Sequence, residues 1–357
     1  MDRKIASIAI VAVALIIVAG AIVLIGDNGG DDTHKVVIKD SLGNDVEVTA
    51  PVTSFCTVNT NAAEFFQMLS IKDMIVGADK ATISSLDTYK NVTNIGEHKN
   101  PVGEKIAETG SKFVISQAEA RSMSAATEQA LKDNYGITVL RLNFYGETML
   151  RDVEQLLKII SSDDAQKIFG EYKDTYKKTV DTVMDKASKA SGDPSFLFFF
   201  TSMSSTNGTY YNENSELGKI AESIHGHNAL KDMKVTSSTK TSKPAKETVF
   251  DYDKSGKLDY VFIRAVSGHA AAADYQTFIK TGGDLNFNEL NVVKNKNIFV
   301  IETDVLSGQR DYIGYVCIAE AFGIDTGLDY NELVNSFNKK YGFDVKYGYI
   351  MEQFPVE

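Results

Sequence analysis

FCTVNTNAAEFFQMLSIKDMIVGAD, residues 55–79, contains one complete repeat of the pattern that runs through this chain. An apolar run ends at the polar triplet NTN (59–61), apolar residues then recur at helical spacing, and a second apolar run follows. Apolar runs that alternate with amphipathic segments predict strand–helix–strand units around a largely parallel sheet. The same alternation recurs at KFVIS (112–116), ITVLRLN (137–143), SFLFFFTS (195–202), LDYVFIRA (258–265) and IFVIETD (298–304).

A long helical pattern divides these units into two groups. Residues 162–189 contain no proline and one glycine, and their apolar residues recur at spacings of three and four. At ~1.5 Å per residue the helix would reach roughly 40 Å, which is long enough to bridge two lobes. We therefore predict an α/β fold of two Rossmann-like lobes joined by a rigid helix. The predicted parts are a transmembrane signal anchor (1–25), a flexible linker (26–35), an N-terminal lobe (36–160), the inter-lobe helix (161–190) and a C-terminal lobe (191–357).

Local signals add detail to the first lobe. Two alternating segments flank Leu42-Gly43-Asn44 and predict a hairpin over residues 36–50. NPVGEKIAETG (100–110) predicts a helix with Asn100 as N-cap and Pro101 as its first residue. The triplet Asn59, Thr60 and Asn61 has two interpretations that do not exclude each other: its side chains face a ligand beyond the strand, or Thr60 or Asn61 caps the following helix.

The charge and the N-terminus limit the possible functions. The 357-residue chain has a net charge of −11 and a pI near 5.1, which argues against a nucleic-acid partner. Residues 5–25 are almost wholly apolar and would span about 31 Å, the thickness of a bilayer's hydrocarbon core. Arg3 and Lys4 precede this segment and acidic residues follow it, so we expect a single-pass cell-membrane protein with an extracellular binding domain. A cleaved signal peptide is the alternative, although its apolar region is usually shorter.

Polar residues at the expected strand ends form the candidate ligand site. In open parallel sheets, ligands bind beyond the carboxyl ends of the strands. Arg offers a rigid fork for anionic oxygens and Tyr a flat wall, a combination that suits a bulky anionic or macrocyclic ligand. The candidate ligand-binding residues are Asn59, Thr60, Asn61, Gln117, Glu119, Tyr145, Tyr210, Tyr211, Arg264, His269 and Arg310.

Metal and catalytic signals are weak. His98, His225, His227 and His269 do not have the spacing of a compact metal motif. The chain has no G-x-S-x-G, P-loop, H-E-x-x-H, paired-Cys or dinucleotide motif. Cys56 and Cys317 lie in apolar segments and are expected to be buried thiols. We therefore predict no catalytic residue, no bound metal and no cofactor. The N-x-T sequons at Asn91 and Asn207 are weak glycosylation signals.

Four segments resemble the substrate-binding proteins of iron-complex and cobalamin ABC importers, and the resemblance covers nearly all of residues 36–350. VVIKDSLGNDVEVTAPVTSFCTVNTNAAEFFQMLSIKDMIVGAD (36–79) is similar to that family's opening, with a D-x-x-G-x-x-V hairpin before the first strand and D-x-I-V-G after the helix. NIGEHKNPVGEKIAETGSKFVIS (94–116) is similar to x-x-N-x-E-x-I-x-x-L-x-P-D-L-V-I. IAESIHGHNALKD (220–232) takes the place of x-G-G-x-N, and LNVVKNKNIFVIETD (290–304) that of A-V-K-N-G-x-V-Y.

The resemblance implies a class III periplasmic-binding-protein fold that holds an iron complex (ferric siderophore or haem) or a corrinoid between its lobes. It also implies delivery to an ABC transporter permease, with Glu104 and Glu216 at the positions of the family's docking glutamates. The chain departs from the family at the lipidated cysteine, which the anchor would replace as in archaeal members, and at His225, which stands where the first glycine of G-G-x-N is expected. The alternatives are a binder of bare zinc or manganese, an anchored chelatase or hydrolase, and an adhesive surface protein.

Overall fold

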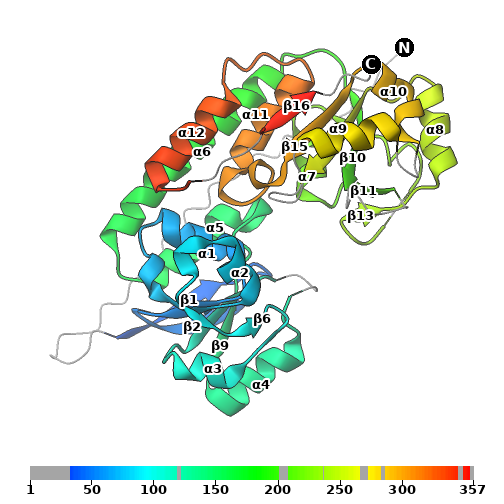
Figure 1. Ribbon diagram of the computed structural model, residues 1–357. Helices are drawn as coiled ribbons and strands as arrows, with labels where there is room; N and C mark the ends of the chain where they lie inside the picture. Colours follow the sequence, from blue (N-terminus) through cyan, green and yellow to red (C-terminus); the bar gives the residue numbers. More distant parts are fainter. Residues whose placement is uncertain are drawn as a thin grey trace, which may run out of the picture. The chain divides into compact units, whose positions relative to one another are not determined.

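The computed structural model describes residues 33–118, 122–200, 208–235, 237–265, 272–282, 286–344 and 349–353 (Figure 1). The predicted anchor and most of the predicted linker lie outside these residues, so the structure does not bear on them. Within the described ranges, no helix combines the length and the apolar character that a membrane span requires. Residues His34–Glu357 form one compact unit, which is described below.

A hairpin and a parallel sheet form the first half of this unit. Strands β1 (His34–Lys39) and β2 (Asp45–Ala50) pair antiparallel, which confirms the predicted hairpin. The next sheet has the order β5-β4-β3-β8-β9 and its pairs are all parallel. Its strands are β3 (Phe55–Thr57), β4 (Ile75–Ala78), β5 (Thr93–Asn94), β8 (Phe113–Ser116) and β9 (Thr138–Arg141). Its helices are α1 (Thr60–Met68), α2 (Lys80–Ser85), α3 (Gly103–Glu108), α4 (Ala125–Tyr135) and α5 (Met149–Ile159).

The helix predicted from residue 100 begins later than expected. Asn100 and Pro101 form strand β7, which pairs antiparallel with β6 (Gly96–Glu97), and Val102 occupies the N-cap position of α3. The prediction of Asn100 as N-cap was therefore wrong. A proline also suits the start of a short edge strand, and the Val102 N–H donates to Ile95 O at 2.7 Å, which keeps this segment extended.

The second half is built on a mixed sheet. Its order is β13-β11-β10-β14-β15-β16, and β12 pairs with β10. The central strands β10 (Ser195–Phe200), β14 (Tyr260–Ala265) and β15 (Ile298–Glu302) are parallel, whereas β11 (Thr209–Tyr211), β13 (Thr241–Ser242) and β16 (Met351–Gln353) add antiparallel pairs; β12 is His227–Asn228. The helices are α7 (Glu216–Ser223), α8 (Lys246–Lys254), α9 (Ala272–Thr281), α10 (Asn291–Lys294), α11 (Asp311–Ala321) and α12 (Tyr330–Tyr341).

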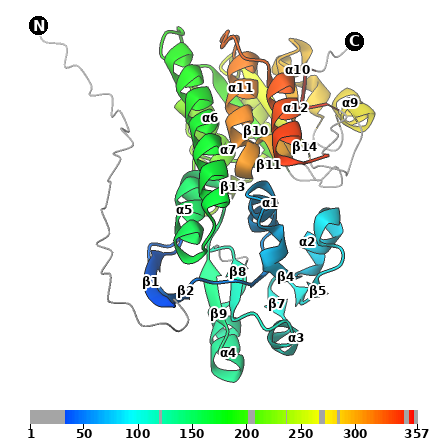
Figure 2. The ribbon, with the colours of Figure 1, turned by 90° about the vertical axis from the view of Figure 1, so that its left-hand side faces the viewer.

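Helix α6 (Asp163–Ala187) separates the two sheets along the chain and lies beside α11 (Figure 2). Ser162 caps it, accepting a hydrogen bond from the Ala165 N–H at 3.2 Å, as the sequence predicts. On its apolar face, Phe169, Tyr172 and Val183 are buried. One apolar cluster includes residues of both sheets together with α6, α11 and α12. The two halves are therefore joined by a shared hydrophobic core as well as by the continuous helix α6.

Candidate functional site

Asn59 has a structural role at the end of strand β3. It is 1% exposed, and its Oδ1 accepts hydrogen bonds from the N–H groups of Asn61 (3.1 Å) and Ala62 (3.4 Å), which caps α1. The prediction that Thr60 or Asn61 caps this helix was therefore wrong, because both lie in its first turn. Its Nδ2 donates to the carbonyls of Leu142 (2.9 Å) and Asn143 (3.0 Å), beyond the end of β9. Asn59 thus satisfies the helix end and ties two neighbouring strand ends together, so all of these polar contacts are made within the fold.

The other two residues of the triplet point to different neighbours. The hydroxyl groups of Thr60 and Thr82 lie 3.1 Å apart. Asn61 faces the second half of the molecule, because a Cβ placed on Gly308 would meet Asn61 Oδ1 at 3.2 Å. Gly308 has a φ of +67°, a backbone conformation that glycine adopts without strain. The segment after β3 therefore contacts the segment after β15 across the two halves.

The loop after β9 is held by a buried carboxylate. Asp152, on α5, is fully buried and accepts hydrogen bonds from Thr148 Oγ1 (2.7 Å), Ser41 Oγ (2.9 Å) and the backbone N–H groups of Asn143 (3.0 Å) and Phe144 (3.2 Å). Burial raises the pKa of Asp152, and these hydrogen bonds oppose the rise. Phe144 has a φ of +57°, which is uncommon for a residue with a side chain. Asp152 therefore fixes a strained turn, and Tyr145 follows it directly.

Arg264 is positioned at the carboxyl end of β14 by three neighbours. Its Nε donates to Thr303 Oγ1 at 3.0 Å and its Nη1 donates to the Tyr211 hydroxyl. Its guanidinium carbon lies 5.8 Å from the ring centre of Phe200, at the end of β10. Phe200 is one of the few large apolar side chains that remain exposed, at 36%. Burial raises the pKa of Tyr211, and the charge of Arg264 opposes that rise. This part of the site combines a fixed cation with aromatic walls.

Glu64, Gln309 and Arg310 form a closed contact between the halves, which we call the Glu64 junction. Glu64, on α1, accepts a hydrogen bond from Gln309 Nε2 at 2.5 Å and lies 3.4 Å from Arg310 Nη2. Arg310 is 1% exposed, and its guanidinium lies 5.0 Å from the ring of Phe337 and 4.9 Å from that of Phe343. Arg310 was predicted as a ligand-binding residue, and the structure places it inside this contact.

A pocket of about 210 Å³ lies nearby, and we call it the Asp311 pocket. Glu216 Oε1 and Lys240 Nζ form an ion pair of 2.7 Å in it, and Lys240 Nζ also lies 5.2 Å from the ring centre of Tyr145. Asp311 is 5% exposed, and none of the described residues gives its Oδ1 a hydrogen bond. The lining residues are Asn143, Tyr145, Gly146, Glu147, Thr148, Tyr176, Glu216, Lys219, Ile220, Lys240, Asp311 and Tyr315.

The arrangement of the two sheets and the linking helix identifies the fold by comparison with solved structures. A TroA-like periplasmic binding protein, FepB, from Veillonella parvula has a TM-score of 0.68 and 16% identity, over 89% of this chain and 99% of that chain. The chain has the fold of the class III periplasmic binding proteins. CeuE from Helicobacter pylori, solved with Ni(II) bound, has a TM-score of 0.61 and 17% identity, over 87% of this chain and 97% of that chain.

A third solved structure extends this likeness. A periplasmic haem-binding protein from Pseudomonas aeruginosa has a TM-score of 0.57 and 14% identity, over 76% of this chain and 92% of that chain. No protein-family profile matches the sequence, and no curated protein matches it either. At these identities the likeness establishes the periplasmic-binding-protein fold, and the ligand has to be argued from this chain's own residues.

The remaining predicted site residues have varied placements. Tyr210 is 3% exposed and packs on Phe199, with ring centres 5.3 Å apart, whereas Gln117 is half-buried after β8. Glu104 is exposed on α3, but Glu216 is half-buried and paired with Lys240 inside the Asp311 pocket. Glu119 and His269 lie outside the described residues, as does Asn207. The structure thus brings Tyr211 and Arg264 together and leaves the roles of the others as predictions.

Among the pocket residues that were not predicted, three supply its charge and hydrogen-bonding groups, and each was missed for a different reason. Tyr176 was read only as part of the apolar face of the long helix. Lys240 lies in a Lys- and Ser-rich segment that resembles a surface loop, and its pairing with Glu216 depends on the fold. Asp311 falls within the polar segment 307–312, which follows a strand, so position alone marked its neighbourhood without separating it from Arg310.

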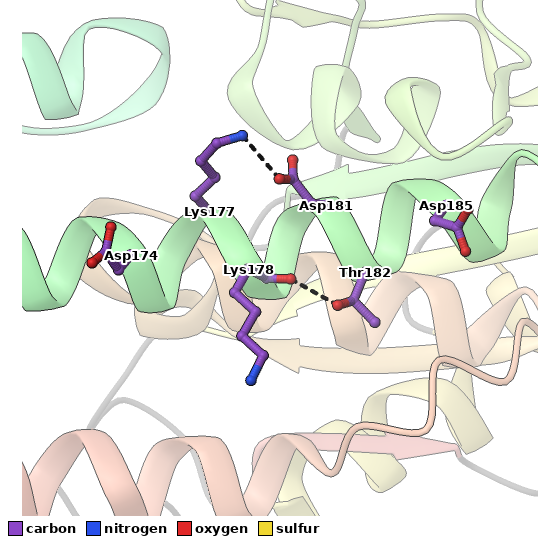
Figure 3. A pocket seen from close by; sticks show the side chains of 6 residues that line it. All are labelled: Asp174, Lys177, Lys178, Asp181, Thr182 and Asp185. Atoms are coloured by element: carbon purple, nitrogen blue, oxygen red, sulfur yellow. Dashed lines mark hydrogen bonds and ion pairs between the residues drawn. The ribbon is translucent and has the colours of Figure 1, made fainter.

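Three other features of the described residues were considered as sites: a hollow on α6, groups of metal-ligating side chains, and the two cysteines. Six residues of α6, namely Asp174, Lys177, Lys178, Asp181, Thr182 and Asp185, line a shallow hollow (Figure 3). They belong to the solvated face of a single helix, where Lys177 and Asp181 form an exposed ion pair of 3.0 Å. In the described part of the chain, no group of three His, Cys, Asp or Glu side chains is placed to hold a metal ion. Cys56 and Cys317 are free and buried, as predicted.

Proposed function

We propose that the protein captures an iron complex, either a ferric siderophore or haem, between its two halves and passes it to an ABC importer permease. A corrinoid is a second ligand of the same type, because it is also a large metal macrocycle. The observation that carries this proposal is Arg264, which Tyr211 and Thr303 orient beside the exposed ring of Phe200. A fixed guanidinium binds carboxylate or phenolate oxygens, while aromatic rings cover the flat part of such a ligand.

The fold and the names of its structural neighbours support this proposal. Those neighbours include a periplasmic haem-binding protein and CeuE with Ni(II) bound. The segments after β3 and β9 of one sheet meet segments of the other half at Gly308 and Lys240, so strand ends of both sheets approach one another. Binding and release need no covalent chemistry.

Retention of coloured ligands tests the proposal. The full chain in neutral detergent would be mixed with haemin, a ferric trihydroxamate or cyanocobalamin, desalted, and measured by visible absorbance. We expect retention of at least one complex, with affinity reduced about 10- to 100-fold in Arg264→Met, because a charge-assisted hydrogen bond contributes about 1.5–3 kcal/mol. Lys178→Met, on the exposed face of α6, removes the same charge and should bind like the wild type. Equal affinity in all three proteins would reject the role of Arg264.

We further propose that Glu104 helps to dock the protein on its permease and that residues 5–25 anchor it in the membrane. Glu104 is exposed in the first turn of α3, where a carboxylate is accessible to a basic partner. Glu104→Lys should lower transport while leaving chelate affinity unchanged, and Glu108→Lys on the same helix is the matched control. Membrane fractionation of the full chain against a chain that lacks residues 1–25 tests the anchor. Recovery of both chains in the soluble fraction would refute it.

A further inference from the structure

The charges in the Asp311 pocket do not balance. Lys240 pairs with Glu216 at 2.7 Å, and Lys219 pairs with Glu147 at 2.7 Å. These two pairs use both lysines that line the pocket. Asp311 is the third carboxylate of the lining, and none of the described residues pairs with it as a cation. When Asp311 is ionised, the described side chains that line the pocket therefore carry one negative charge in excess.

Asp311 also has an unused acceptor. Tyr176 donates a hydrogen bond to its carboxyl group and the Tyr312 backbone N–H contributes another, but within the described residues Oδ1 receives none. A buried carboxylate oxygen without a partner is destabilising, so a donor from outside the protein would be stabilising there. Asp311 is 5% exposed, and it lines a pocket that opens beside Tyr145, in the same loop after β9 that we assign to the ligand cleft.

We propose that the Asp311 pocket is a subsite for a protonated amino group carried by the ligand that the neighbouring cleft binds. A primary ammonium supplies both the missing positive charge and the missing donor. The hydroxyl-bearing rings of Tyr176 and Tyr315 line the same pocket and favour an organic cation. The volume of about 210 Å³ is smaller than an ordinary ligand site, which suits one arm of a larger molecule.

This inference rests on the proposed binding function, since it adds a chemical class to the ligand: a metal chelate with a free amine. Two forms of one ferric trihydroxamate, with a terminal ammonium or with that amine acetylated, would be compared by the same absorbance measurement. We expect the ammonium form to bind at least tenfold more tightly at pH 8. Equal binding of the two forms would overturn the subsite. If neither chelate is retained, the proposed function fails for this ligand class, and the following titration still decides the subsite.

A simple amine isolates the pocket from the cleft. n-Butylammonium chloride would be titrated into the full chain in detergent, with saturation-transfer NMR on the butyl protons as readout and 1-butanol as the neutral control. We expect saturable binding of the ammonium alone, and an Asp311→Asn protein that binds at least tenfold more weakly. Asp174→Asn, which removes an exposed carboxylate from α6, should match the wild type. Displacement by an equal concentration of potassium chloride would show a metal-cation site and overturn the amino-group assignment.

The pH dependence gives a second readout that does not depend on the Asn variant. Burial raises the pKa of Asp311 to about 7, so its ionised fraction, and with it ammonium affinity, should fall about tenfold between pH 8 and pH 6. Tyr176→Phe removes a donor to the ionised carboxylate and should move the midpoint to higher pH. An unchanged midpoint would contradict the proposal. The groups that face Asp311 are Tyr172, Tyr176, Tyr312, Tyr315 and Glu216, with Lys219, Lys240 and Glu147 elsewhere in the lining.

Discussion

Arg310 and Asp311 are consecutive residues that are both charged and both buried, yet their surroundings differ. Arg310 contacts Glu64 of α1, and its guanidinium lies 5.0 Å and 4.9 Å from the stacked rings of Phe337 and Phe343. Asp311 lines a pocket whose lysines are already paired with other carboxylates. One residue completes a contact between the halves, and the next leaves an acceptor unused.

The difference shows how two consecutive residues of this fold divide between a structural contact and a pocket. Buried polar groups normally have partners, and a satisfied network makes one arrangement of the chain rigid. In the Glu64 junction, Gln309 Nε2 and Arg310 Nη2 both contact Glu64 and fix α1 against the segment before α11, although Gln309 Oε1 receives no hydrogen bond from the described residues. The unpartnered oxygen of Asp311 differs because it belongs to a carboxylate that lines a pocket, where a bound ligand would supply the donor. The predictions below test this contrast.

The largest effect is expected from breaking the Glu64 junction. Arg310→Met keeps an unbranched apolar side chain beside the two rings but leaves Glu64 without its cation, so the free energy of unfolding should fall by about 3–5 kcal/mol. Denaturant unfolding of the full chain measures this loss. Lys177→Met breaks only an exposed pair on α6, and its effect should stay below about 0.5 kcal/mol. The double variant Glu64→Gln, Arg310→Met should recover part of the loss. Equal stability of Arg310→Met and the wild type would show that Arg310 does not stabilise the contact between the halves, and its contrast with Asp311 would then fail.

Asp311→Asn should raise the free energy of unfolding at high pH, whereas Arg310→Met lowers it. Burial raises the pKa of Asp311 to about 7 in the folded chain from its ordinary value of 3.8, so between these pH values the folded state holds a proton that the unfolded state has released. Between these values the wild type therefore loses stability as the pH rises, on the order of 1 kcal/mol per pH unit. Asp311→Asn cannot titrate, so its advantage over the wild type should grow from pH 4 to pH 7. Unfolding curves at these pH values measure the difference, and a pH-independent difference would argue against a strained carboxylate.

Asn59 shows the cost of losing a polar group that the fold uses completely. Asn59→Ala removes both the helix cap and the two donations to the carbonyls after β9, for an expected loss of about 2 kcal/mol. Asn59→Asp keeps an oxygen for the cap but cannot donate, and it places a carboxylate against two carbonyls. We therefore expect Asn59→Asp to be at least as destabilising as Asn59→Ala. If Asn59→Asp were as stable as the wild type, the cap alone would explain the residue.

The elements of the fold could be predicted from the sequence because they depend on local pattern. Alternation and helical spacing predicted the hairpin over 36–50 and the helix over 161–190, and the structure has them at 34–50 and 163–187. The start of α3 was misplaced because Asn100 and Pro101 suit a helix start locally, while pairing with β6 decides otherwise. Strands β11 and β16 of the second sheet pair antiparallel with their neighbours. Short apolar runs do not show whether a strand will pair parallel or antiparallel.

The sequence predicted where the candidate site lies, at the ends of the strands, but not the role of each residue there. Position after a strand marked Asn59, Arg264 and Arg310 alike. Whether each side chain caps a helix, faces the cleft or fills a junction depends on residues up to 246 positions away, as for Arg310 and Glu64. Single-sequence reasoning has no access to such contacts. The resemblance marked His225 only as a departure from the family's glycine, and the conformational constraint at this position is seen in the structure alone.

The smallest expected effect follows from that position, and it separates stability from binding. His225 has a φ of +70°, in the left-handed region that glycine adopts without steric cost, and its side chain is 45% exposed and lies 3.7 Å from Asp193. His225→Gly should therefore raise the free energy of unfolding by up to about 1 kcal/mol, whereas His225→Ala keeps a Cβ and should not. Thermal unfolding measures both variants, with an expected rise of about 2 °C for glycine. Residue 225 follows α7, which carries Glu216 into the Asp311 pocket, so butylammonium binding should stay unchanged if the pocket is rigid. A stabilised His225→Gly protein with weaker amine binding would show instead that the pocket depends on strain after α7.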